Sequence, residues 1–208
     1  MDKSYREIAV GQTAAVPRTT KETQDFLRTI WSAPHHSLMT QIAPWFERKF
    51  EFSFPVEIFP DLCIRLRGTP PHLEELLRGC SAERLTRKSE GKWSAQEHAG
   101  HLLDLEPLGM ARLEDYAAGR PQLTATDLAN RRTDEANFNA CPLEKILSDF
   151  RAARLEFVDR VASFDPAWRA RAAIHPRLKQ PFRLVDFLFF VAEHDDHHLA
   201  VIWEMLHG

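Results

Sequence analysis

Long segments with the apolar spacing of α-helices place the strongest constraint on what this chain can fold into. The clearest one begins at Pro142 and ends near Asp165, and its apolar residues recur with a period of about 3.6 positions. Another begins at the capping box formed by Ser94 and Glu97 and ends at Gly119. The sequence has no internal repeat and no sustained strand-like alternation. These features predict a chain built mainly from long helices.

Further helical signals complete this pattern. The last segment, from about residue 184 to 206, is predicted to be helical. The run Thr69-Pro70-Pro71 is expected to open a helix that ends at Gly79, with threonine as N-cap and proline in the first turn. A shorter helix is predicted over 127–137. Long helices joined by short loops predict an all-α fold, an up-and-down four-helix bundle with an N-terminal extension.

The remaining stretches define the expected domain organisation. Residues 166–182 contain the pairs His175-Pro176 and Gln180-Pro181 and are interpreted as an irregular loop, and residues 51–64 as an extended connector or short edge strand. A capping box predicts a helix over 19–31. We therefore expect a partly helical N-terminal extension over 1–60 and the bundle over 61–208.

Composition limits the classes of function. The chain has 208 residues, of which 44% are hydrophobic and 27% charged, which is sufficient for one folded core. Its formal net charge of −3 provides no basic excess, so nucleic acid is not an expected partner. We find no targeting signal and no apolar run approaching the ~20 residues of a membrane span. The three cysteines form no CxxC pair, so we expect a cytoplasmic protein.

A cluster of histidines in the last predicted helix is the candidate for metal binding. Residues 193–198 read Glu-His-Asp-Asp-His-His. His194 and His198 are four residues apart, which places both imidazoles on one face of a helix, ~6 Å apart. That spacing allows the two rings to bind one metal ion. Asp195 falls on the apolar side of the same helix, where we expect it to orient a ligand histidine.

The helix that begins after Ser94 offers the third ligand. It carries His98 and His101, and periodicity alone does not choose between them. Glu97 and Asp104 lie about one turn from His101, and we expect them to act as a general base or as hydrogen-bond partners of the ligands. A polar core network without metal is the alternative interpretation of the whole cluster.

Three histidine ligands leave a coordination position open, which is typical of a catalytic metal site. A metal there activates water for hydrolysis or binds a thiolate. Imidazole ligands suit zinc, nickel, copper and iron alike. The expected partner is therefore a small-molecule substrate.

Several other charged residues receive simpler interpretations. His175 precedes a proline and is interpreted as a surface-loop residue, although extended backbone there also allows it to reach a site. His35 and His36 are assigned to a cap or the surface. Arg131-Arg132 and the segment 151–154 are interpreted as solvated helix faces, with an anion-binding patch as the alternative.

Two segments of the chain resemble a known family. Gly91-Lys92-Trp93-Ser94 through Glu106 and Ala192 through Leu199 are similar to the DinB/YfiT-like superfamily of metalloenzymes. Arg65 through Pro70 and His175 through Leu178 support the resemblance, which covers the chain from about residue 60 onward. The resemblance implies a four-helix bundle with a three-histidine site, and by motif its ligands are His101, His194 and His198.

The same resemblance implies a range of activities. It implies zinc or nickel as the metal, dimers as a common assembly, and either hydrolysis or transfer reactions that use a low-molecular-weight thiol. A non-catalytic metal-binding or sensor protein of the same fold is the alternative. The first 60 residues are not covered by the resemblance.

Overall fold

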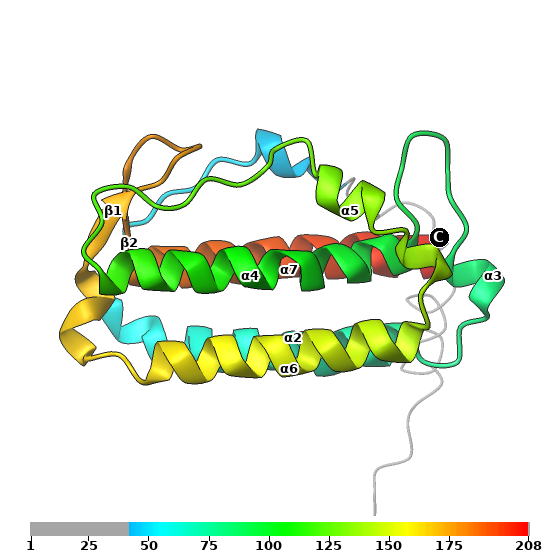
Figure 1. The fold of residues 1–208 in the computed structure, drawn as a ribbon, viewed down its shortest axis with the longest axis horizontal. Helices are drawn as coiled ribbons and strands as arrows, with labels where there is room; N and C mark the ends of the chain where they lie inside the picture. The colour runs from blue at the N-terminus through cyan, green and yellow to red at the C-terminus, as the bar shows by residue number, and fades with distance from the viewer. Residues whose placement is uncertain (1–41, 208) are drawn as a thin grey trace, which may run out of the picture. The chain divides into compact units, whose positions relative to one another are not determined.

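The computed structural model describes residues 42–207, and four long helices lie side by side in it (Figure 1). They are α2 (Phe59–Leu77), α4 (Ala95–Ala117), α6 (Leu143–Ala162) and α7 (Leu184–His207). The short elements are α3 (Ala82–Leu85), α5 (Arg131–Glu135), four 3-10 turns (Trp45–Glu47, Val56–Ile58, Phe138–Ala140 and Pro166–Ala170), and the strands β1 (Ala172–Ile174) and β2 (Pro181–Arg183). The predicted all-α four-helix bundle is confirmed.

The chain path through the bundle has one feature that the loop lengths did not predict. Gln96 at the start of α4 donates to the carbonyl oxygen of Cys141 just before α6, at 2.9 Å. Glu114 and Arg160, near the other ends of the same two helices, form an ion pair at 2.9 Å. Helices α4 and α6 therefore run in the same direction (Figure 1). This departs from a strict up-and-down order, because the connection 118–142 returns along the bundle and carries α5.

Two groups of apolar side chains form the core. One contains Leu66, Leu113, Phe157 and Phe187, and the other contains Leu73, Leu102, Phe150 and Ile202. On α7 the buried members of the first group end at Ala192, and those of the second begin at Ile202. The histidine-rich residues 193–198 therefore lie along α7 between two apolar layers.

Helix α2 begins ten residues before the predicted N-cap at Thr69, at Phe59. The helix start predicted at Thr69 is therefore wrong, since Pro70 and Pro71 lie inside α2. Proline lacks the N–H that would bond the carbonyl of the residue four positions earlier. The carbonyl oxygen of Leu66 accepts a hydrogen bond from Nη1 of Arg154 instead, at 3.4 Å. This bond from α6 replaces one that Pro70 cannot donate.

The predicted irregular loop over 166–182 is also corrected. It contains the 3-10 turn Pro166–Ala170 and an antiparallel hairpin in which Ala173 pairs with Phe182. The hydroxyl of Tyr116, at the end of α4, donates to the carbonyl oxygen of Phe182 at 2.8 Å. Strands of three residues are too short to produce a recognisable alternation, and their packing on α4 and α7 stabilises them.

Residues 42–58 pack against the bundle ahead of α2. Trp45, Phe50, Phe52 and Phe54 contact the core group that contains Phe187 and Phe190. The division at residue 60 stays a prediction, and the helix predicted over 19–31 and the pair His35-His36 lie outside the described residues. Among residues 42–207, no helix combines the length and apolar character that a membrane crossing requires.

Candidate metal centre

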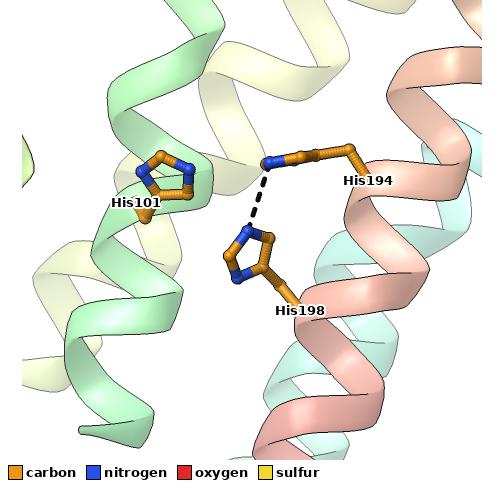
Figure 2. A group of neighbouring side chains, drawn as sticks. All are labelled: His101, His194 and His198. Carbon is orange, nitrogen blue, oxygen red and sulfur yellow. Dashed lines mark hydrogen bonds between the residues drawn. The ribbon is translucent and has the colours of Figure 1, made fainter. Parts of the chain in front are cut away.

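Three imidazoles from two helices meet inside the bundle. His101 projects from α4, and His194 and His198 project from α7 toward it (Figure 2). One nitrogen from each ring can be chosen so that all three atoms lie within 4.8 Å of one another. The Nε2 atoms of His194 and His198 are 3.2 Å apart. The spacing of four residues on α7 produces this pair, and the antiparallel neighbour α4 brings His101 to it.

A hydrogen-bond chain orients His101. Its Nδ1 lies 2.9 Å from the hydroxyl oxygen of Thr133 on α5, and that hydroxyl donates to Oδ2 of Asp104 at 3.1 Å. Because the Thr133 proton is directed at the carboxylate, the hydroxyl accepts from Nδ1–H of His101. The Nε2 of His101 then carries the lone pair that a metal needs.

His98 occupies a different place in the cluster. Its Nδ1 lies 2.8 Å from Nδ1 of His198, on the side of that ring away from the contact with His194. His98 is not one of the three residues whose ligand atoms converge. The structure thus groups His101 with the α7 pair, and it places His98 behind His198.

The surroundings keep these imidazoles neutral. Burial, followed by the neighbouring His98, lowers the pKa of His101 to about 4. Burial and then the adjacent imidazoles hold the pKa values of His194 and His198 well below the ordinary range. Neutral rings expose lone pairs at neutral pH, which is the state that metal binding requires. Three neutral nitrogen donors fit zinc and other borderline transition metals.

A cavity of about 510 Å³ opens beside the three histidines. Its apolar wall contains Leu105, Phe187, Phe190 and Val191, and its polar wall includes Arg112, Arg177 and His175. Trp45, from the segment ahead of α2, contributes a further face, with its ring centroid 4.8 Å from that of His194. The candidate site therefore borders a space large enough for a small molecule.

A family model described as the DinB superfamily matches residues 65–202, which is more than half of the chain. The chain belongs to the DinB superfamily. Among solved structures it is similar to YfiT from Bacillus subtilis, with 17% identity and a TM-score of 0.68. The match covers 76% of this chain and 91% of that one, and that protein is described as a probable metal-dependent hydrolase with an unusual four-helix bundle topology. No curated protein matches the sequence. The predicted family and fold are thereby confirmed.

Asp195 of this DinB-superfamily chain does not bond a ligand histidine, contrary to the prediction. Its carboxylate accepts from the hydroxyl of Thr69 at 2.8 Å and from both terminal nitrogens of Arg154. Arg154 also pairs with Glu106 at 2.6 Å. Arg154 is 1% exposed, so interpreting it as part of a solvated face is wrong. The ion cluster joins α2, α4, α6 and α7 immediately beside His194.

The two predicted acids lie outside the cavity wall. Glu97 accepts from the backbone N–H of Ser94 and from Nζ of Lys88, both at 2.8 Å, and so completes the capping box of α4. Asp104 accepts from Thr133 and pairs with Arg132 at 3.3 Å. Neither contributes to the wall of the cavity. In the part of the chain that the structure describes, the side chain of Asp104 reaches that of His101 through the hydroxyl of Thr133.

Sequence reasoning missed several residues of the DinB-superfamily site. Thr133 lies in a five-residue helix of the return connection, and its spacing from His101 carries no signal. Trp45 lies in the segment ahead of α2, outside the four long helices. His175, interpreted as a surface residue, is 2% exposed and lines the cavity. Its position before a proline was the one available indication that its side chain reaches inward.

Proposed function

We propose that this protein is a metal-dependent enzyme that acts on a small molecule. The observation that carries the proposal is the convergence of three neutral imidazoles, His101, His194 and His198, beside a cavity of about 510 Å³. Three protein ligands with adjoining free space are typical of a catalytic metal site, whereas structural sites have four ligands. Zinc and nickel are the proposed metals, since both accept imidazole ligands.

When bound, such a metal supplies Lewis-acid chemistry, which activates water or a thiol sulfur at neutral pH. The residues of this chain prepare the site for it. Thr133 and Asp104 hold the His101 ring with Nε2 directed inward, and His98 supports His198 from behind. The apolar walls of the cavity reduce the access of bulk water and strengthen the electrostatic interactions within it.

Hydrolysis is the favoured reaction. The similarity in fold to a protein described as a probable metal-dependent hydrolase supports it. Transfer of a low-molecular-weight thiol to an electrophile is the alternative, because the same open position accepts a sulfur ligand. The general-base role of Glu97 or Asp104 stays a proposal, and their contacts favour a capping role for Glu97 and a positioning role for Asp104. Dimerisation also stays a prediction.

The decisive test is the metal content of the purified protein. We expect one zinc or nickel ion per chain in the wild type and none in His101→Ala or His194→Ala. His72→Ala is the matched control, because His72 is exposed on α2. Elemental analysis gives the stoichiometry, and thermal melts with and without a chelator show whether the ion binds the folded state.

Each of the other outcomes would indicate a different role or a different ligand set for this protein. Metal absent from the wild type even after zinc or nickel is added would leave a structural bundle with a polar histidine network. Loss in His194→Ala but not in His101→Ala would move the third ligand to His98. Full metal binding without turnover on ester, amide and thiol-electrophile panels would favour the metal sensor or carrier.

A further inference from the structure

The wall of the cavity carries a second polar group that takes no part in the three-histidine site. It consists of Arg112 on α4 and of His175 and Arg177 in the turn between β1 and β2. Arg112 is 5% and His175 is 2% exposed, whereas Arg177 is half-buried at the edge of the group. We call these three residues the cationic group.

His175 presents a hydrogen-bond donor to the cavity. Its Nδ1 accepts from the backbone N–H groups of Arg177 at 3.2 Å and Leu178 at 3.1 Å. The neutral ring therefore carries its proton on Nε2. Nε2 is buried, and within residues 42–207 it has no hydrogen-bond partner. A buried donor without an acceptor is destabilising, so an acceptor is expected at this position when the site is in use.

Arg177 also has a buried nitrogen, Nη2, that lacks a hydrogen-bond partner in the described part of the chain. The guanidinium instead lies against aromatic rings, with Cζ 5.3 Å from the centroid of Phe46 and 5.4 Å from that of Phe190. Burial lowers the pKa of Arg177. A guanidinium partly withdrawn from water attracts an anion more strongly than a fully solvated one does.

Arg112 adds a second positive charge to the cationic group. Its Nε donates to the carbonyl oxygen of Thr124 at 3.0 Å, which fixes the side chain, and its Cζ lies 5.9 Å from the ring centroid of Phe187. Burial lowers the pKa of Arg112 to about 10; Tyr116 and Asp115 oppose this shift, and the positive charge of Arg177 adds to it. Two cations on one wall repel each other unless an anion lies between them.

Two other arginines near the core show the usual arrangement, in which a guanidinium is paired with a carboxylate. Arg154 pairs with Glu106 and Asp195, and Arg183 pairs with Asp186 at 2.6 Å. Among the ion pairs formed within residues 42–207, none includes Arg112 or Arg177. Asp115 acts on Arg112 electrostatically but pairs with Arg120 at 3.4 Å, so within the described residues the cationic group has no carboxylate in direct contact and is open to an anionic ligand.

We propose that the cationic group binds the carboxylate of a substrate whose apolar body fills the cavity. That the other end of this substrate reaches the metal rests on the proposed function. Trp45 connects the two sites, because its ring centroid lies 4.8 Å from that of His194 and 5.9 Å from Cζ of Arg177. Leu105, Phe187 and Val191 supply the apolar wall. The substrate class is therefore a small carboxylic acid with a reactive group remote from the carboxylate.

The test compares hexanoate with hexanamide by titration calorimetry. The two probes have the same apolar body and differ in charge. We expect the zinc-loaded and the chelator-treated wild type both to bind hexanoate, at least tenfold more tightly than hexanamide. Arg177→Gln and Arg112→Gln should each weaken hexanoate binding by tenfold or more. Arg67→Gln, on the exposed face of α2, should leave it unchanged.

Other results would overturn the proposal. Equal affinity for hexanoate and hexanamide, or no binding of hexanoate at millimolar concentration, would show that the cationic group does not recognise carboxylates. Binding that requires zinc and is unaffected by Arg177→Gln would place the carboxylate on the metal. Circular dichroism and zinc stoichiometry of each variant verify its fold. Failure of the metal site alone would leave hexanoate binding to the chelator-treated protein intact, so the two proposals fail separately.

Discussion

The Nδ1 atom of His98 lies 2.8 Å from the Nδ1 atom of His198. Only one of these two nitrogens can carry the shared proton when both rings are neutral. If Nε2 of His198 binds a metal, its Nδ1 must carry the proton and donate it to His98. His98 is then a positioning residue that fixes the tautomer and the ring orientation of a ligand.

This relationship predicts that His98→Ala keeps one metal per chain but binds it more weakly. Loss of a hydrogen-bond partner of a ligand histidine typically lowers metal affinity ~10- to 100-fold. His98→Asn should recover part of the affinity, because its side-chain oxygen can accept the same bond. Competition with a chelating dye measures the affinities. Loss of stoichiometry in His98→Ala would instead identify His98 as a ligand.

Thr133→Val should weaken metal binding by roughly tenfold, again with unchanged stoichiometry. The substitution keeps the volume of the side chain but removes the hydroxyl between His101 and Asp104. The ring of His101 then loses its acceptor, and the buried Nδ1–H is left without a partner. Thr133→Ser retains the hydroxyl and serves as the control in the same competition assay. Equal affinity of the valine and serine variants would contradict the role assigned to Thr133.

The features that could be predicted from the sequence are those that repeat along one helix. Ser94 and Glu97 form the predicted capping box, and the spacing of His194 and His198 predicts their shared face correctly. Such signals depend only on helix geometry and on residues within one or two turns.

The features that could not be predicted depend on neighbours distant in sequence. Asp195 sits on the apolar side of α7, which indicates a buried partner, but nothing in the local pattern names Arg154 of α6. The common direction of α4 and α6 follows from the route of the connection 118–142, whose own helical signals are weak. His175 becomes an interior residue only because the hairpin folds over the cavity.

Arg154→Met should destabilise the protein by about 3–5 kcal/mol, because it leaves two buried carboxylates, Glu106 and Asp195, without their cation. Urea unfolding of the metal-free protein measures this free energy. Arg151→Met, on the same helix, removes a partly exposed pair with Glu74 and should cost at most ~1 kcal/mol. Similar losses in both variants would show that the buried cluster contributes no more than a surface ion pair.

Gly100→Ala should also destabilise the protein, by roughly 1–3 kcal/mol. A Cβ atom at this position in α4 would come within 2.2 Å, 2.3 Å and 2.6 Å of three ring atoms of Phe138, so the 3-10 turn Phe138–Ala140 must move. The matched control is Gly68→Ala in α2, where the nearest atom is 3.9 Å away. Better helix propensity should make that variant more stable by about 0.5–1 kcal/mol. Thermal melts of the two variants should therefore shift in opposite directions.

His175 should make the metal-free protein less stable in acid. Burial, followed by the positive charges of Arg112 and Arg177, lowers its pKa from 6.5 to about 3. Between pH 3 and pH 6.5 the unfolded chain binds a proton at His175 that the folded protein does not bind. The stability that the neutral His175 ring contributes is therefore complete above pH 6.5 and is lost as the pH falls toward 3. From pH 7 to pH 5 the loss attributable to this residue is roughly 1 to 2 kcal/mol.

His175→Asn isolates this effect, because asparagine keeps an acceptor for the backbone N–H groups of Arg177 and Leu178 but does not titrate. Urea unfolding in the presence of a chelator, at pH 7 and at pH 5, gives the two free energies for each protein. The wild type should lose more stability than the variant over this interval, since the other buried histidines contribute equally to both. Equal losses would mean that His175 binds a proton as readily in the folded protein as in the unfolded chain, which would contradict the lowered pKa assigned to the buried ring.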